Sequence, residues 1–422
     1  MQLQDTIERL KKDMLDPQFH WQPDHADSRV SYSGRSRANV AVVGGSFAGL
    51  SAAYHLINNG FSGTISLVEK DRIGDAAARA AGILTPCTEE DLTDLAEQFG
   101  LRDGLLVWKA QREGIDSIEM AVSDAKMSCG FTRAPSYSFF NEGEAHTAIA
   151  EKNLRDASGS LTHVIEAPSY GKRVGYAAAL MSDDALINPA MYCRELARRV
   201  EALGVRIYEQ SPVRSVSPGR VELENGSIAA DTVILAGQRV PYALGQGKFP
   251  LAVETACLAT RPLSDAERLK SGVDSQCSFW GSGLPYYYGR TTEDGRVMIG
   301  GAAVFSLVAP IVRRRQEERL LRKLHEFFPT LTADDVEYMW HGKLHVVSDL
   351  LPVVGETVPG IHVIGNAPGI PFATISGKVV ADAIQGKQSP YADVFRISKK
   401  SRARGKTNLK RDLKTGLSLL GF

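Results

Sequence analysis

A group of residues near the start of the chain combines glycines that bend the backbone with a carboxylate further on. Gly44, Ser46 and Gly49 hold the three positions of a G-x-G-x-x-G turn, with serine replacing the middle glycine and Gly45 beside it. Glu69 follows Gly49 by about 20 residues, the spacing at which an acid accepts hydrogen bonds from a ribose, and an acid there argues against a 2′-phosphate. Phosphates bind the free N–H groups where such a turn opens a helix. The spacing therefore predicts a dinucleotide site.

The elements around the turn favour this interpretation over a purely structural turn. The apolar run ANVAVVGG predicts a buried parallel strand, FAGLSAAYHLINNG a helix, and GTISLVEK a second strand that ends at Glu69. Strand, helix and strand in this order form a mononucleotide-binding half. The residues expected to contact the cofactor here are Gly44, Gly45, Ser46, Phe47, Ala48, Gly49, Glu69 and Lys70.

Two later segments indicate which dinucleotide binds. In GDAAARAAGIL the small residues would let the backbone pass under a bulky, extended cofactor, with Arg79 available to its phosphates or ring edge; the alternative is a plain loop with a solvated arginine. In VIGNAPGI a glycine-rich turn after a strand could close over an isoalloxazine ring, a return that a simple NAD enzyme does not need. The expected contacts are Ala77, Ala78, Arg79, Gly82, Ile83, Leu84, Gly365, Asn366, Gly369 and Ile370.

With these segments in this order, the chain resembles the FAD-dependent glycine and D-amino-acid oxidase (DAO) superfamily over about residues 39–394. The stretch EYMWHGKLHVVSDLLPVVGE is most similar to the γ-glutamylputrescine oxidoreductase branch. The resemblance implies FAD as cofactor, an adenine contact from the Val213 backbone and further contacts from Ala236 and Gly237. We expect noncovalent FAD, because no cysteine follows Cys277.

The implied fold is α/β, with a Rossmann-like FAD-binding domain of the glutathione-reductase type and a mixed-sheet (α+β) substrate domain. The FAD-binding domain is expected to be discontinuous, formed by residues 37–95, 185–240 and 345–394. Residues 96–184 and 241–344 would form the substrate domain. A helix and linker precede them at 1–36, and a basic tail follows at 395–422.

The resemblance also implies a reaction, the oxidation of a C–N bond in an amine or amino acid. A hydride passes to flavin N5, and the imine hydrolyses. In YYYGRTTEDGRVMIGG, Tyr286, Tyr288 and Arg290 share a strand face because side chains alternate. Arg290 is expected to bind a substrate carboxylate, and Tyr288 and Trp340 to line the cavity. The alternative is that Arg290 faces solvent and the aromatic residues pack the sheet.

Two other functions stay open. One is a flavin dehydrogenase that passes electrons to a quinone or a protein instead of O₂. The other is a flavin-binding interaction protein without turnover. It is motivated by the basic C-terminal tail and by NAPGIPF, which stands where the family often has Gly-His-Gly. Ser46 and Ala80 also depart from the family pattern, which has glycine and asparagine there.

No second glycine fingerprint for NADPH is evident, so the electrons would come from the substrate.

Composition and charge narrow the classes of function that this protein could have. Lys plus Arg and Asp plus Glu both total 49, so no global charge favours nucleic acid. We find no signal peptide and no transmembrane stretch, and we expect a cytoplasmic protein. The tail carries nine basic residues between Arg396 and Lys414. Such a run is usually solvated, and the alternative is a dock for an acidic partner or lipid surface.

The cysteines and histidines do not suggest a metal centre. The five cysteines are far apart and form no C-x-x-C pair, so we expect buried, reduced thiols. His341 and His345 lie four residues apart in a predicted loop or strand with no third ligand type nearby. We therefore predict no metal site.

Overall fold

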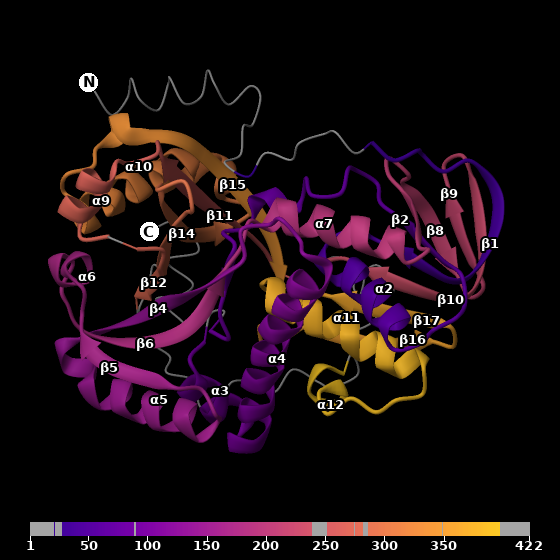
Figure 1. Ribbon diagram of the computed structural model, residues 1–422, viewed down its shortest axis with the longest axis horizontal. Helices are drawn as coiled ribbons and strands as arrows, with labels where there is room; N and C mark the ends of the chain where they lie inside the picture. The colour runs from indigo at the N-terminus through magenta and orange to yellow at the C-terminus, as the bar shows by residue number, and fades with distance from the viewer. Residues whose placement is uncertain are drawn as a thin grey trace.

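The computed structural model contains two β-sheets joined by a group of helices (Figure 1). It describes residue 21 and residues 28–87, 90–238, 251–273, 275–281, 286–347 and 349–396. The predicted N-terminal helix and the basic tail after Arg396 lie outside these ranges. The fold class is confirmed as α/β with one Rossmann-like sheet and a second, mixed sheet.

The first sheet carries the glycine turn and has eight strands. Its main path runs β16, β17, β10, β1, β2, β7, and the neighbours from β17 to β7 are parallel. β10, which carries the apolar run DTVILA, lies beside β1 and parallel to it. The strands are β1 (Gly34–Val43), β2 (Ile65–Val68), β7 (Arg206–Tyr208), β8 (Val213–Ser217), β9 (Arg220–Leu223), β10 (Gly226–Ala236), β16 (Val353–Val358) and β17 (Ile361–Gly365).

Three helices accompany the first sheet, namely α2 (Phe47–Asn58), α7 (Pro189–Ala202) and α11 (Ile370–Ile384). α7 begins after Asn188, whose side chain accepts a hydrogen bond from the Met191 N–H at 3.1 Å. α2 and α11 pack very closely, since a Cβ added at Gly377 would lie 2.6 Å from the Ala52 nitrogen. All four β2 residues are buried, as expected for a parallel strand covered on both faces.

The second sheet has nine strands in the order β15, β11, β14, β13, β12, β4, β6, β3, with β5 beside β6. β3 falls within the predicted FAD-binding segment 37–95 but pairs with β6 of this sheet. The strands are β3 (Ile83–Leu84), β4 (Thr132–Asn141), β5 (Thr162–Glu166), β6 (Tyr176–Leu186), β11 (Leu251–Thr260), β12 (Ser278–Gly281), β13 (Tyr287–Thr291), β14 (Val297–Phe305) and β15 (Val336–Val346).

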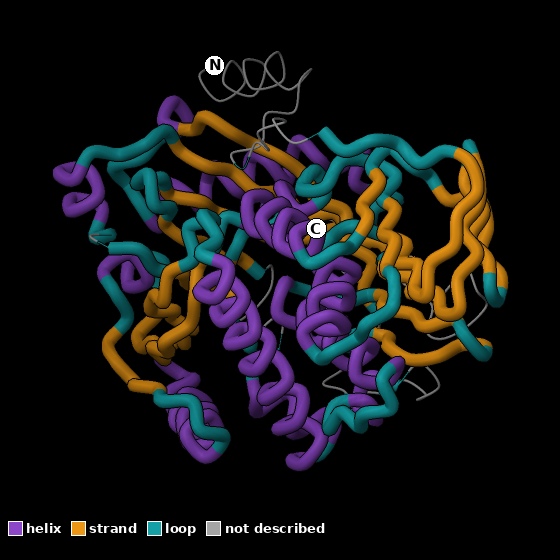
Figure 2. Tube along the Cα trace, turned by 45° about the vertical axis from the view of Figure 1, so that its right-hand side comes forward, coloured by secondary structure: helices purple, strands orange, loops and turns teal. Residues whose placement is uncertain are grey.

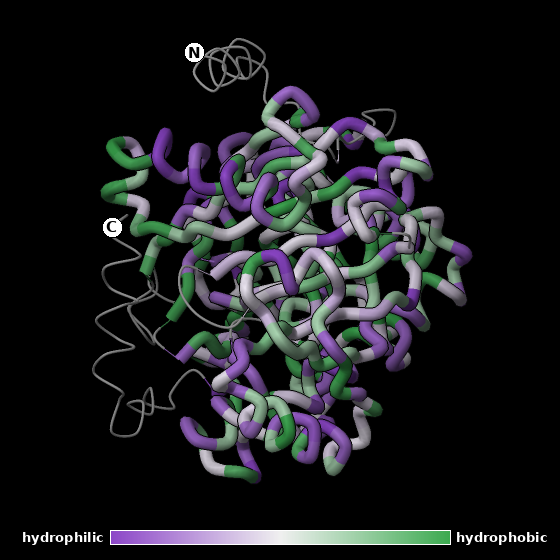
Figure 3. Tube along the Cα trace, turned by 90° about the vertical axis from the view of Figure 1, so that its left-hand side faces the viewer, coloured by the Kyte–Doolittle hydropathy of each residue, from purple (hydrophilic) through white to green (hydrophobic). Residues whose placement is uncertain are grey.

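Amphipathic helices cover the outer face of the second sheet. In α10 (Ala309–Phe327), Gln316, Leu320 and Leu324 recur every fourth residue and are buried, while Arg314, Arg315 and Arg322 are exposed. Figure 3 shows hydrophilic and hydrophobic residues alternating along the chain on this side. The shorter helices on this sheet are α6 (Ser169–Arg173) and α9 (Asp265–Ser271).

The helices α3 (Leu92–Phe99), α4 (Leu101–Ala125), α5 (Ala145–Ala157) and α12 (Ala392–Phe395) complete the molecule. Figure 2 shows central helices standing between the strands of the two sheets. α4 meets the start of α11 there, because a Cβ at Gly114 would lie 2.5 Å from the Pro371 carbonyl oxygen. Among the described helices, none is both long and apolar enough to cross a membrane.

Candidate FAD site

The glycine turn between β1 and α2 has no room for side chains at two positions. Gly44 has φ +110°, and a Cβ there would lie 2.1 Å from the Ala236 carbonyl oxygen. A Cβ at Gly49 would lie 1.9 Å from the Gly44 carbonyl oxygen. Ser46 is the N-cap of α2, and its side chain makes no capping hydrogen bond. The backbone at the start of α2 is therefore free to bind an anion at close range.

Glu69 lies directly against this turn at the end of β2. Its Oε2 accepts a hydrogen bond from the Gly45 N–H at 2.7 Å, and its Oε1 accepts one from the Asp71 N–H at 3.0 Å. Lys70 is exposed and pairs with Asp71. The Ser211 N–H donates to the Glu69 carbonyl oxygen at 2.8 Å, which brings the start of β8, Val213, close to this acid.

The same edge of the first sheet collects the other predicted segments. β1, β2, β10 and β17 are parallel neighbours, so their carboxyl ends meet at one edge. Ala236 ends β10, and the Gly237 N–H donates to the Ile364 carbonyl oxygen at 2.9 Å. Phe47, at the start of α2, stacks on Tyr192 with ring centroids 6.3 Å apart, and Ala48 follows it, partly buried.

The turn after β17 contains two residues with positive φ angles. Asn366 is buried and has φ +53°, and Gly369, with φ +79°, is the N-cap of α11. The Asn366 Nδ2 donates to the carbonyl oxygens of Gln238 (2.8 Å) and His345 (2.9 Å). Gly365 and Ile370 are buried on either side.

The small-residue segment reaches the second sheet. Ala77, Ala78 and Arg79 form a 3-10 turn in which the alanines are buried and Arg79 is exposed. Gly82 has φ +72°, and its carbonyl oxygen accepts the Ile187 N–H at 2.9 Å. Ile83 and Leu84 then pair with β6 as β3. The segment thus links the two sheets.

Arg290, predicted to bind a substrate carboxylate, is 2% exposed and contacts backbone carbonyls. Tyr288 lies over Gly300, and its hydroxyl is 3.2 Å from the Cys257 Sγ. Trp340 is buried, and its Nε1 donates to the Arg79 carbonyl oxygen at 3.2 Å. The structure therefore places Arg290 and Trp340 against the small-residue segment. Their contacts with a substrate stay a prediction.

His341 and His345 have different partners. The Nε2 of His341 is 3.7 Å from a carboxylate oxygen of Glu317, and burial lowers the pKa of His341 to about 4. The His345 side chain is 3.3 Å from the Gln238 side-chain oxygen. All five cysteines are buried and free, as predicted.

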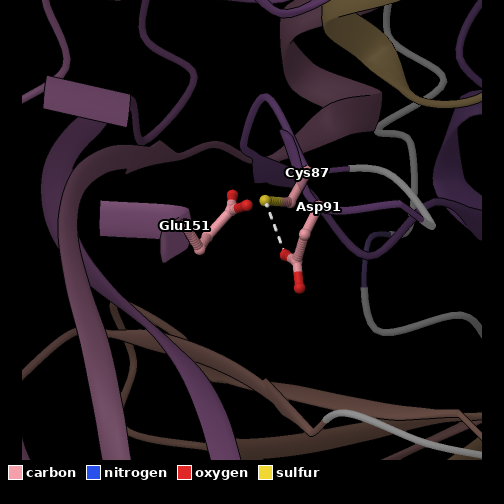
Figure 4. Close-up of side chains that lie close together, drawn as sticks. All are labelled: Cys87, Asp91 and Glu151. Atoms are coloured by element: carbon pink, nitrogen blue, oxygen red, sulfur yellow. Dashed lines mark hydrogen bonds between the residues drawn. The ribbon is translucent and has the colours of Figure 1, made fainter. Parts of the chain in front are cut away.

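The sequence analysis missed one polar cluster, formed by Cys87, Asp91 and Glu151 (Figure 4). Their ligand atoms lie within 4.8 Å of one another, the arrangement that a metal ion could use. The buried Arg155 already supplies a cation, with Nη2 3.1 Å from both the Cys87 Sγ and the Asp91 Oδ1. Burial raises the pKa of Asp91 to about 6, although Arg155 opposes the shift. We therefore interpret the cluster as an ion-pair network.

Only part of this cluster has a signal in the sequence. Glu151 and Arg155 are four residues apart on α5, the spacing of a helical ion pair, and the Arg155 Nε is 2.6 Å from the Glu151 Oε1. Cys87 and Asp91 belong to a distant segment, and nothing in their spacing indicates that they meet α5.

The fold joins a second, mixed sheet to a Rossmann-like sheet that carries the glycine turn at the carboxyl end of β1, and this is the architecture of a dinucleotide-binding protein. The model of the FAD-dependent oxidoreductase (DAO) family matches residues 39–383, so the chain belongs to that family. It is an enzyme, and its cofactor is FAD. The predicted resemblance to the FAD-dependent DAO superfamily is confirmed.

Known proteins of this family are similar along most of the chain. γ-Glutamylputrescine oxidoreductase of Escherichia coli is 25% identical over 85% of this chain and 85% of its own. Glycine oxidase of Bacillus licheniformis is 24% identical over 87% of this chain and 98% of its own. The crystal structure of glycine oxidase from Geobacillus kaustophilus shares the fold, with a TM-score of 0.67 and 19% identity over 86% of this chain and 99% of its own.

Proposed function

We propose that this protein oxidises the C–N bond of an amine or amino acid with noncovalently bound FAD. The observation that carries the proposal is the meeting of the glycine turn, Glu69 and the turn before α11 at one sheet edge. The similarity to a γ-glutamylputrescine oxidoreductase and a glycine oxidase supports an amine or amino acid as substrate.

The residues present fit FAD. A Cβ at Gly44 or Gly49 would clash with the Ala236 or Gly44 carbonyl oxygen, so these glycines allow the tight turn and the close helix–strand packing that a dinucleotide site uses. The free N–H groups at the start of α2 would hold that diphosphate, and Glu69 would hold the ribose. The segments 77–84 and 365–370 would flank the ring system.

The bound cofactor would supply the acceptor for a hydride, which carries both electrons away from the substrate carbon. The protein's part is to orient the substrate and to keep water out. Tyr286 and Tyr288 pack with the large core between the sheets, with ring centroids 6.1 Å apart, and would form an apolar wall. The Tyr288 hydroxyl lies 3.2 Å from the buried Cys257 thiol, and either group can donate the hydrogen bond.

An anaerobic screen tests this function. Purified yellow protein is mixed without oxygen with a panel of amines and amino acids, and the flavin absorbance is followed. We expect at least one compound to bleach the flavin and release an aldehyde, ketone or oxo acid. A protein that binds FAD but is bleached by no amine would overturn the proposal and favour the flavin-binding interaction protein.

Re-oxidation in air identifies the electron acceptor. Hydrogen peroxide formed in proportion to the substrate consumed indicates an oxidase. A reduced flavin that stays reduced in air, and is re-oxidised by a soluble quinone, indicates a dehydrogenase.

A further inference from the structure

Arg290 is a buried arginine that bonds to backbone oxygens in two distant segments and to that of its neighbour on β13. Its Nη1 donates to the carbonyl oxygens of Ala81 (3.2 Å), Gly82 (2.7 Å) and Ile187 (2.9 Å). Its Nε donates to the carbonyl oxygen of Thr291 at 3.2 Å. The side chain therefore ties β13 to the small-residue segment and to the end of β6.

The fit at Gly82 shows that this contact is tight. A Cβ at Gly82 would lie 2.6 Å from the Arg290 Nη1 and 2.2 Å from the Ile187 carbonyl oxygen. The Gly82 carbonyl oxygen accepts two hydrogen bonds, from Arg290 and from the Ile187 N–H. Since Gly82 also has a positive φ, its conformation and its position are both fixed.

Trp340 also contacts the small-residue segment, at a second point. Its indole Nε1 donates to the carbonyl oxygen of Arg79 at 3.2 Å, and the side chain is buried among Ala78, Cys257 and Met298. Two side chains of the second sheet, from β13 and β15, thus hold residues 79–82 from one side.

The charge of Arg290 has no matching acid among the residues that the structure describes. No described carboxylate lies within 4.0 Å of its guanidinium nitrogens, whereas Arg296 in the same hairpin pairs with Asp294 and Glu337. The ring of Trp21 lies 5.2 Å from the guanidinium carbon. Burial lowers the pKa of Arg290 to about 9, which leaves it charged at neutral pH.

We infer that Arg290 is a positioning residue of the FAD site, which holds residues 81–82 in place and sets a buried positive charge beside them. This role replaces that of a ligand for a substrate carboxylate, and it rests on the proposed function, in which this segment flanks the flavin. A positive charge there favours the negative charge that reduction adds to the cofactor, and so raises the reduction potential.

The test uses the holoenzyme and the variants Arg290→Lys and Arg290→Met. The readouts are the visible flavin spectrum, the dissociation constant of FAD and the midpoint potential. We expect both variants to bind FAD about tenfold or more weakly, because charge-assisted hydrogen bonds are lost. We expect Arg290→Met to lower the potential, and Arg290→Lys to lower it less because lysine keeps the charge. Arg296→Lys is the matched control and should leave all three readouts unchanged.

A carboxylate ligand would give a different result. If Arg290→Met leaves the spectrum, FAD affinity and potential unchanged and raises KM for a carboxylate substrate alone, the inference is overturned. If both Arg290 variants fail to fold, Trp340→Phe removes the bond to the Arg79 carbonyl oxygen and keeps an aromatic ring. An unaltered spectrum and FAD affinity in Trp340→Phe would then overturn it. A wild-type protein that takes up no FAD would instead refute the proposed function.

Discussion

At Gly49 the backbone has no room for one more methyl group. We predict that Gly49→Ala weakens FAD binding by about tenfold or more, because its Cβ would lie 1.9 Å from the Gly44 carbonyl oxygen and the turn must shift. Titration of the apoprotein with FAD, followed by flavin fluorescence, measures the effect. Gly143→Ala is the control, since a Cβ there has no neighbour within 4 Å. Equal affinity in the two variants would show that the phosphates bind elsewhere.

Residues whose roles depend only on motif spacing or strand alternation could be predicted from the sequence. The G-x-G-x-x-G spacing and the acid after the second strand led to Gly45 and Glu69, which the structure joins by a hydrogen bond. Strand alternation put Tyr288 and Arg290 on one face of β13. Alternation does not say what packs against that face, so the carbonyl partners of Arg290 could not be foreseen.

At the scale of elements, the cluster of Figure 4 joins α5 to the start of α3. Glu151 is fully buried and accepts hydrogen bonds from the N–H groups of Leu92 (2.9 Å) and Thr93 (2.7 Å). The Arg155 Nε is 2.6 Å from the same carboxylate. Glu151 therefore both caps α3 and neutralises a buried arginine.

We predict that Glu151→Ala lowers the free energy of unfolding by roughly 3 to 5 kcal/mol, because it removes the nearest carboxylate partner of the buried Arg155 and the acceptor of the Leu92 and Thr93 N–H groups, and leaves Asp91 as the remaining acid beside Arg155. Urea denaturation of the purified holoenzyme measures the change. Asn153→Ala on the exposed face of α5 is the control and should change stability by less than about 0.5 kcal/mol. A loss as small in Glu151→Ala as in the control would mean that this network contributes little to folding.

The order of the strands could be predicted from the sequence where apolar runs are strong. The runs ANVAVVGG and GTISLVEK led to β1 and β2, which are parallel neighbours. The packing of α3 and α5 was not predicted, because their contacts join segments about 60 residues apart that share no local pattern.

At the scale of the whole molecule, buried histidines in both sheet regions link stability to pH. Burial lowers the pKa of His55 on α2 to about 4, against a smaller effect of Asp382 and Glu113, and Lys378 adds to the shift. His341 on β15 has its pKa lowered to about 4 by burial and by Arg313. In the unfolded chain both have a pKa of about 6.5. Between these values the unfolded chain binds more protons, so stability rises with pH.

We predict that unfolding free energy falls by about 2 kcal/mol for each of the two histidines between about pH 7.5 and about pH 5. The loss begins as the pH drops below the unfolded pKa and levels off below the folded one. Urea denaturation at the two pH values measures it, and His55→Gln with His341→Gln should flatten the dependence. His163→Gln, at an exposed position, should not. A double variant as sensitive to acid as the wild type would place the responsible protons on other groups.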